Sequence, residues 1–301
     1  MFGVTILGNN SALPAYDRHP TAQVVTLNDQ LLLIDCGEGT QTQLSKYKIR
    51  RSKINHILIS HLHGDHYFGL PGLITSMGLL GREHDLHVYA PAALETILHL
   101  QLKAGNTDLP FALHFHALEN FEDILIDEKK FSVQLFTTEH RVRCWGFIIK
   151  EKKMPRKINK EVVQQYAIPA SYYESLQRGE AYTNKAGYTF KNEVLTIPNK
   201  AAKSYVYCAD TRYVEKNTSI CKQATLLYHE TTYLQNCEHK AALRFHSTSI
   251  QAGTFAANAG AHKLIIGHFS SKYECLDEFL TETQTVFPNT ELALEGVTFL
   301  V

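Results

Sequence analysis

The stretch HLHGDH at residues 61–66 contains four potential metal ligands within six residues, and it follows the short apolar run Ile57–Ile59. Its first two histidines are two residues apart, so an extended backbone can direct both imidazoles to one side. The glycine permits a tight turn that brings the aspartate and the last histidine round. Imidazole and carboxylate together suit zinc or a similar borderline metal rather than calcium. The stretch therefore predicts a site for zinc or a similar borderline metal after a strand, with the potential ligands His61, His63, Asp65 and His66.

Short apolar runs that lead to a polar residue occur six times along the chain. They are partly β-branched, which is typical of buried strands, and helical patterns at 92–103, 247–259 and 274–285 lie between some of them. This alternation indicates an α/β fold. Because ligands bind at the carboxyl ends of strands in such sheets, six endings of this kind predict one shared site. The residues that follow the runs are Asp35, His61, His140, Asp210, His229 and His268.

The bulk composition is that of a soluble globular protein with a sizeable core, because 44% of the 301 residues are hydrophobic and 20% are charged. No apolar window approaches the length of a membrane span, no signal peptide is recognisable, and none of the six cysteines forms a C-x-x-C pair. These features predict a cytoplasmic protein. Lys+Arg and Asp+Glu both total 30, so any nucleic-acid partner needs a local basic surface.

Residues from about 150 to 200 interrupt the alternation of strands and helices. This segment is polar, aromatic and basic, and residues 150–160 carry six Lys or Arg against one Glu. A charge run of this kind is commonly a solvated surface insertion. The functional alternative is a protruding arm that binds a polyanion.

The HLHGDH stretch resembles the signature of the metallo-β-lactamase superfamily, and the other motifs of that superfamily follow in order. They are Asp35 in IDCGEGTQ, His140, Asp210 in CADTR, and His268 in GHFSSKY. The resemblance implies an αββα sandwich with two zinc ions per subunit. It implies that one zinc is held by His61, His63 and His140, that the other is held by Asp65, His66 and His268, and that Asp210 bridges them. Asp65 would also orient the zinc-activated hydroxide or accept its proton.

Within the superfamily, three stretches resemble ribonuclease Z. They are IDCGEGTQTQL from residue 34, HETT at 229–232 and HST at 246–248. The resemblance implies an endoribonuclease that cleaves precursor tRNA at its 3′ end and leaves a 3′-hydroxyl on the tRNA and a 5′-phosphate on the trailer. A bridging hydroxide would attack phosphorus, and His246, oriented by Glu230, would protonate the leaving oxygen. It also implies a homodimer and a tRNA-binding role for the 150–200 arm, whereas His229 is interpreted as a packed strand-end residue.

Two departures and two alternatives remain. The arm carries Ala170-Ser171 where the family usually has Gly-Pro, and the loop that the family links to rejection of CCA ends matches only at Pro14 and Arg18. One alternative is another binuclear hydrolase of this fold, acting on a small phosphodiester, sulfate ester or lactone; the HST stretch and the basic arm argue against it. The other is a non-catalytic RNA-binding subunit, against which the complete ligand set argues. His114 and His116 are assigned to a strand with one wet face.

Overall fold

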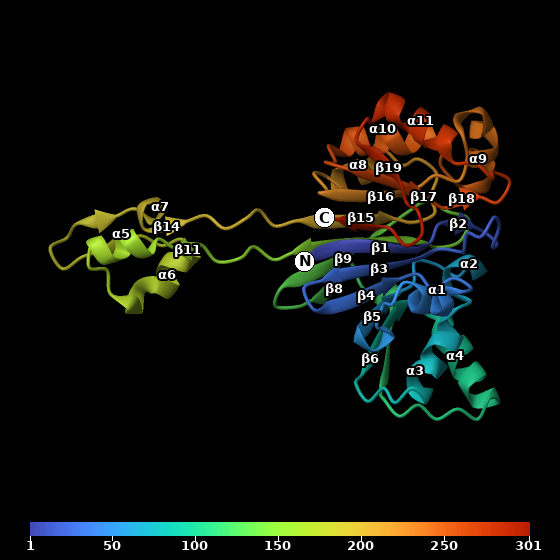
Figure 1. The fold of residues 1–301 in the computed structure, drawn as a ribbon, viewed down its shortest axis with the longest axis horizontal. Coiled ribbons are helices and arrows are strands. Elements are labelled where there is room, and N and C mark those ends of the chain that lie inside the picture. Colours follow the sequence, from blue (N-terminus) through green and yellow to red (C-terminus); the bar gives the residue numbers. More distant parts are fainter. The chain divides into compact units, whose positions relative to one another are not determined.

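Two seven-stranded sheets packed face to face form the body of the protein, seen in a computed structural model that describes all residues from Met1 to Val301 (Figure 1). The first sheet has the order β20 (Thr298–Leu300), β1 (Phe2–Gly8), β3 (Ala22–Leu27), β4 (Gln30–Ile34), β5 (Ile54–Leu58), β6 (Leu86–Ala90) and β7 (Leu113–Ala117). The second has the order β19 (Thr290–Leu292), β17 (Leu264–Gly267), β16 (Leu226–Glu230), β15 (Ser204–Cys208), β10 (Trp145–Glu151), β9 (Phe131–Thr137) and β8 (Ile124–Asp127).

Helices cover the outer face of each sheet and bury its apolar side chains (Figure 1). The first sheet packs against α1 (Thr40–Lys46), α3 (Leu70–Leu79) and α4 (Ala93–Ala104). The second packs against α10 (Ser249–Ala259) and α11 (Asp277–Val286), next to α8 (Lys216–Ile220). These layers confirm the predicted α/β class and form the αββα sandwich that the superfamily resemblance implies. None of its helices has the length and apolar character that a bilayer crossing requires.

Buried tyrosines of β15 join the two sheets through hydrogen bonds. The Tyr205 hydroxyl donates to the Gln23 side chain on β3, and the Tyr207 hydroxyl donates to Asp35 Oδ2 at 2.6 Å. All four side chains are fully or almost fully buried, so each hydrogen bond satisfies groups that would otherwise be costly to desolvate. The second bond ties the core directly to a residue at the end of β4.

Five of the six polar residues singled out in the sequence lie at the ends of parallel strands: Asp35, His61, Asp210 and His268 follow β4, β5, β15 and β17, and His229 is the penultimate residue of β16. The strands β4 and β5 are parallel, and so are β15, β16 and β17. Parallel strands end at one edge, so the residues after them gather there. The six predicted strands are confirmed as β4, β5, β9, β15, β16 and β17, and the three predicted helices as α4, α10 and α11.

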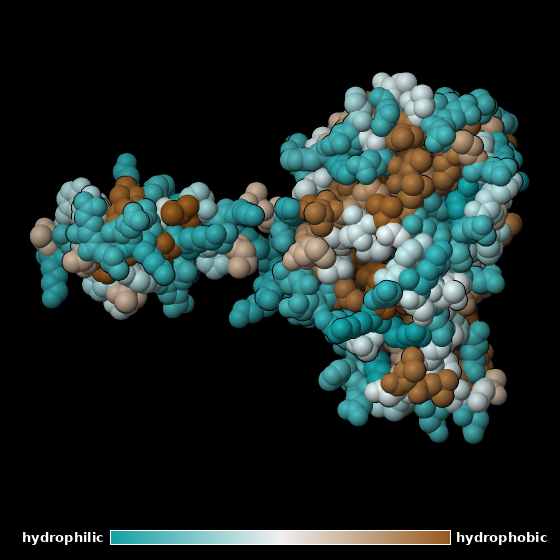
Figure 2. Space-filling view, viewed as in Figure 1, coloured by the Kyte–Doolittle hydropathy of each residue, from teal (hydrophilic) through white to brown (hydrophobic).

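Residues Lys150–Lys203, together with Glu128–Phe131, form a second compact unit. Its elements are β11 (Lys157–Ile158), α5 (Lys160–Gln165), α6 (Tyr173–Arg178), β12 (Tyr182–Thr183), β13 (Thr189–Phe190), α7 (Asn192–Leu195) and β14 (Thr196–Ile197). A small core contains Val163, Ile168, Leu176, Tyr182 and Leu195. The surface that this unit presents in Figure 2 is mostly hydrophilic. The unit is therefore a folded element with its own apolar interior.

Charge is unevenly divided between the two parts of the chain. Residues 150–203 contain eleven Lys or Arg against five Glu and no Asp, which leaves 19 basic against 25 acidic residues elsewhere. The chain as a whole has zero net charge, but residues 150–203 have an excess of positive charge and the rest of the chain has an excess of negative charge. Tyr172 and Tyr166 remain 45% and 43% exposed there, whereas Tyr182 is buried.

The small core of the second unit predicts that it can unfold on its own. Replacing Leu176, which is 1% exposed, by alanine should cost roughly 2–5 kcal/mol, a large share of the stability of so small a unit. Hydrogen exchange should accelerate in residues 150–203 and stay unchanged in residues 204–301. The matched variant Val194→Ala, at a side chain 48% exposed, should leave exchange unaltered. Equal loss of protection in both parts would contradict the independence of the unit.

Candidate metal centre

Seven side chains from loops at the strand ends converge on one point. His61 and His63 follow β5, and the short helix α2 (Gly64–Tyr67) then presents Asp65 and His66. The other three residues follow β9, β15 and β17 and are His140, Asp210 and His268. All the candidate ligands named from the sequence are therefore brought together by the fold.

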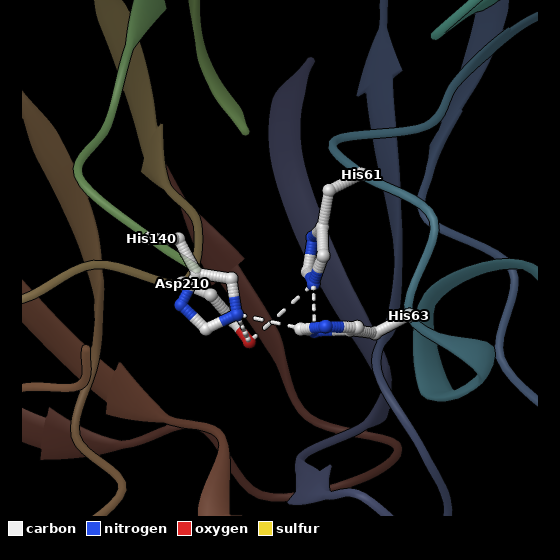
Figure 3. Close-up of side chains that lie close together, drawn as sticks. All are labelled: His61, His63, His140 and Asp210. Atoms are coloured by element: carbon white, nitrogen blue, oxygen red, sulfur yellow. Dashed lines mark hydrogen bonds and ion pairs between the residues drawn. The ribbon is translucent and has the colours of Figure 1, made fainter. Parts of the chain in front are cut away.

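Three histidines and Asp210 form the first group, within which every ligand atom lies within 4.8 Å of the others (Figure 3). His63 Nδ1 lies 3.0 Å from His61 Nε2 and 3.1 Å from His140 Nε2. Asp210 Oδ2 lies 3.6 Å from His61 Nε2 and 3.8 Å from His140 Nε2. Figure 3 shows the four side chains pointing toward one another.

The second group contains Asp65, His66 and His268. The Nε2 atoms of the two histidines are 3.3 Å apart, and Asp65 Oδ2 lies 3.6 and 3.4 Å from them. Asp210 Oδ1 lies 3.4 Å from His66 Nε2 and 3.3 Å from His268 Nε2. Each oxygen of the Asp210 carboxylate therefore faces a different group, as a bridge between two cations requires.

The spacing of these donor atoms fits zinc. Zinc–nitrogen bonds of about 2.0–2.1 Å in a tetrahedron place neighbouring ligand atoms about 3.3 Å apart. The separations here run from 3.0 to 3.8 Å. Asp210 is only 2% exposed, and its Oδ1 atom is buried without a well-formed hydrogen bond. A buried anion of this kind needs a cation nearby.

Four of the five imidazoles in the cluster have an oxygen partner for the nitrogen that faces away from the cluster. His66 Nδ1 donates to Asp35 Oδ2 at 2.8 Å, and His140 Nδ1 donates to the Phe245 carbonyl at 2.9 Å. The Nδ1 atoms of His268 and His61 lie 2.9 and 3.1 Å from the hydroxyls of Thr232 and Ser60. Such partners fix the ring orientation and the tautomer that leaves the inner nitrogen free to bind metal.

The electrostatics of the cluster favour a cation as well. Burial lowers the pKa of His61 well below its ordinary value and that of His63 to about 4, so both are neutral, as metal ligands must be. Burial also opposes protonation of His66, but the Asp210, Asp65 and Asp35 carboxylates raise its pKa well above the ordinary value. The same carboxylates would attract a bound metal ion.

Two residues at the site adopt left-handed backbone conformations that side chains other than glycine seldom occupy. Asp35 has φ of 54° after β4, and His268 has φ of 62° after β17. Asp35 is held there by the amide and hydroxyl of Ser60 at 2.7 and 2.9 Å. Backbone strain of this kind persists where the surroundings over-determine the conformation, and it is common at functional sites.

His246 lies in the turn between α9 (Glu238–Arg244) and α10. Phe245 ends α9 in a left-handed conformation, and Thr248 begins α10 with a capping box to Gln251. The left-handed residue before His246 and the capped start of α10 after it restrict the backbone on both sides of His246. Its ring lies 5.0 Å from that of His140 and 5.4 Å from that of His268.

Glu230, the last residue of β16, orients His246. The Glu230 carboxylate is fully buried. Its Oε1 lies 3.0 Å from His246 Nδ1 and also accepts hydrogen bonds from the amides of Thr211 and Ser247. Its Oε2 accepts hydrogen bonds from the amide and the hydroxyl of Thr232. Burial lowers the pKa of His246, but the charge of Glu230 outweighs burial and raises that pKa to about 8. His246 is therefore protonated at neutral pH, and the bond through Nδ1 leaves Nε2 to donate a proton.

Above the cluster is an open pocket of about 790 Å³. His63, Asp65, His140, Asp210 and His246 line it, and its rim includes both basic and apolar residues. A pocket of this size accommodates a few nucleotides or a small molecule rather than a duplex.

Some contacts at the site were not foreseen from the sequence. The hydroxyl of Thr232 contacts Glu230, His246 and His268 together, at 2.8, 3.1 and 2.9 Å. Thr232 is the last residue of the HETT stretch, so the sequence marks it as part of a motif but does not reveal these contacts. Arg141, 3.2 Å from His63 Nε2, and Ser60 carry no sequence signal.

The remaining sequence interpretations concern histidines outside the cluster. His229 is fully buried, donates to the Glu230 carbonyl and packs on Phe255 at 4.8 Å between ring centroids. His114 and His116 lie on the edge strand β7, and His114 pairs with Asp85 at 2.9 Å. None of these three belongs to the metal cluster.

The αββα sandwich and the seven-residue metal cluster define a metallo-β-lactamase-fold hydrolase. The metallo-β-lactamase-fold protein YhfI from Bacillus subtilis shares this fold at a TM-score of 0.70 and 21% identity, covering 99% of this chain and 98% of that one. The crystal structure of human tRNase Z, short form, aligns at a TM-score of 0.73 and 26% identity over 99% of this chain and 98% of that one.

Sequence comparison gives the particular family. Ribonuclease Z of Bacteroides thetaiotaomicron is 40% identical over 297 residues, which are 98% of this chain and 94% of the relative. The chain belongs to the ribonuclease Z family and is a metal-dependent endoribonuclease. Its residues 2–159 also place it in the family described as Anti-Pycsar protein Apyc1. That match ends before Asp210, Glu230, His246 and His268, which complete the site.

The contact between Asp35 and His66 predicts an effect on metal affinity without loss of a ligand. Asp35→Asn should weaken metal binding by roughly 10–100-fold, because the amide holds the outer nitrogen of His66 less strongly than the carboxylate does. Competition with a chromogenic chelator measures this affinity. Asp29→Asn, at an exposed carboxylate in the β3–β4 turn, is the matched control and should leave affinity unchanged. Wild-type affinity in Asp35→Asn would show that Asp35 serves only the fold.

Proposed function

We propose that this protein is a zinc-dependent endoribonuclease that cleaves precursor tRNA at its 3′ end. The observation that carries the proposal is the His246–Glu230 pair, with 3.0 Å between Nδ1 and Oε1, at the rim of the pocket over the metal cluster. A protonated imidazole beside a metal cluster suits release of an alkoxide from phosphorus. Membership of the ribonuclease Z family supports tRNA as the substrate.

Seven side chains would hold two zinc ions. His61, His63 and His140 would hold one, Asp65, His66 and His268 the other, with Asp210 between them. Two zinc ions would supply a water molecule acidic enough to ionise near neutral pH. Asp65 would orient that water, while the Ala12 amide, which donates to Asp65 Oδ2 at 2.7 Å, fixes the carboxylate.

The proton of the reaction would come from His246. The oxygen of the ionised water would form a new bond to phosphorus, the bond between phosphorus and the 3′ oxygen of the tRNA would break, and Nε2 of His246 would give its proton to that oxygen. The tRNA then ends in a 3′-hydroxyl, and the 5′-phosphate stays on the trailer. Glu230 stabilises the imidazolium before the transfer and holds the ring in place.

The second unit would bind the tRNA away from the metals. Nucleic-acid affinity comes largely from neutralised phosphates, and residues 150–203 carry the chain's excess of positive charge. We also propose a cytoplasmic homodimer, as in the family that the sequence resembles. Mixing subunits that lack the arm with His246→Ala subunits should then restore cleavage if one subunit's arm serves the other's site.

His246→Ala should separate proton donation from metal binding. Wild-type protein and variant should both contain about two zinc equivalents by elemental analysis, while kcat for precursor tRNA falls roughly 10²–10⁴-fold, the usual contribution of a positioned acid. His63→Ala is the contrasting variant and should lose both metal and activity. Loss of zinc in His246→Ala would make His246 a ligand and overturn its assignment as the acid.

Replacing residues 152–203 by a short Gly/Ser linker should raise KM for precursor tRNA strongly, while hydrolysis of a small chromogenic phosphodiester survives. The linker can be short because the Glu151 amide donates to the Lys203 carbonyl at 2.9 Å, so the two ends are adjacent.

A charge-only version of the same test keeps the unit folded. Gln at exposed Lys153, Lys157 and Lys160 should weaken tRNA binding and reduce its salt dependence, because up to about three phosphate contacts are lost. Gln at the exposed body lysines Lys103, Lys216 and Lys222 is the matched control. Unchanged salt dependence in the arm variant would place the tRNA-binding surface elsewhere.

A further inference from the structure

The rim of the catalytic pocket differs between the two segments of the chain that line it. Residues 140–271 contribute Arg141, Arg244 and His246, together with Tyr233 and Leu243. Residues 11–68 contribute Leu13, Pro14, Glu38 and Phe68 and no Lys or Arg. One side therefore offers cations for phosphates, and the other offers apolar and aromatic surface.

Phe68 is a large aromatic residue left 63% exposed beside the metal ligands. Its ring packs directly over Gly64, where an added Cβ would lie 2.2 Å from a ring carbon, and it meets the Tyr67 ring edge-on at 5.0 Å. The absence of a side chain at position 64 thus seats the ring against the loop that carries His63 and Asp65. A flat ring held in this way and open to solvent is suited to stacking.

A second hollow adjoins the catalytic pocket at Phe68. Phe68 and Glu38 line both, and the second hollow continues between Gln41, Thr42, Ser45 and Arg51. Arg51 is its one cation, and its guanidinium donates to the Ser45 hydroxyl at 2.9 Å. None of the residues that line this hollow comes from the part of the chain that contains His246. The hollow is therefore a polar path that leads out of the pocket past an aromatic ring.

The direction of the substrate follows from the position of the acid, and this step rests on the proposed function. The 3′ oxygen that leaves belongs to the tRNA, so the last tRNA nucleotide lies on the side of His246 and the arginines. The trailer remains attached to phosphorus through its 5′ oxygen and departs from there. Single-stranded nucleotides bind largely by stacking of bases on aromatic side chains, for which every base has a suitable face.

We propose that Phe68 is a stacking platform for the first base of the 3′ trailer and that the adjoining hollow takes the trailer strand. Phe68 thereby positions the scissile phosphate over the metals from the downstream side. The residue contributes no proton and no metal ligand; it selects substrates that carry a base immediately after the cleavage site.

The test compares two precursor tRNAs that differ only in the first trailer nucleotide, which is normal in one and abasic in the other. Phe68→Ala should lower kcat/KM for the normal substrate roughly 5- to 100-fold, the range expected for one base–aromatic stack. It should leave the abasic substrate at the wild-type rate for that substrate. Phe68→Trp should restore the normal substrate, whereas Phe68→Leu, which keeps bulk without a stacking face, should not.

Two controls separate this inference from the proposed function and from folding. Leu79→Ala, at an apolar side chain 83% exposed at the end of α3, should change neither substrate, and zinc content should be equal in all variants. If Phe68→Ala lowers both substrates equally, the ring only supports the ligand loop and the stacking proposal is overturned. If the wild-type protein cuts no precursor tRNA, the proposed function fails, and the trailer assignment fails with it.

Discussion

A buried carboxylate, Asp210, is the constraint on which the rest of the site depends. It is 2% exposed, and its two oxygens lie 3.3–3.8 Å from four imidazole nitrogens, which come from the segments that follow β5, β9 and β17. An isolated anion in such a place is very costly unless opposite charge compensates it. The ligand atoms around Asp210 can hold a compensating cation only if the strand ends of both sheets meet, so the candidate metal site requires the packing of the two sheets.

The shell around the cluster shows how the fold turns histidines into oriented ligands. Asp35 accepts from His66, Ser60 and Tyr207, and Tyr207 lies on the strand that leads to Asp210. The Tyr207–Asp35 contact in the core between the sheets therefore helps to fix the orientation of the His66 ring. Thr232 performs a similar task on the opposite side, where its hydroxyl contacts both His246 and His268. A change in the core at β15 should consequently alter the orientation of the candidate ligand rings.

The candidate ligands and the excess of positive charge lie in different parts of the chain. The body holds every candidate ligand and His246, whereas residues 150–203 hold eleven basic residues against five acidic ones. Within the pocket the same division recurs on a smaller scale, with arginines on the side of His246 and Phe68 on the other. Electrostatic attraction acts over distance and needs no exact fit, so it suits the duplex part of a substrate. Stacking requires contact and so suits single nucleotides beside the cleavage point.

The sequence by itself determined the α/β class, the strands that end at the site and the four potential ligands within residues 61–66, because ligand spacing there is local and apolar runs reveal strands directly. The complete set of seven candidate ligands came from the resemblance to the metallo-β-lactamase superfamily, since the strand-end pattern pointed equally to Asp35 and His229. Only the tertiary structure decided which oxygen of Asp210 faces which group, that the Thr232 hydroxyl contacts both His246 and His268, and that Arg141 lies against His63. It also showed that Phe68 stays exposed while its neighbour His66 is buried. These relations depend on the order and packing of strands far apart in the chain, and no local pattern records them.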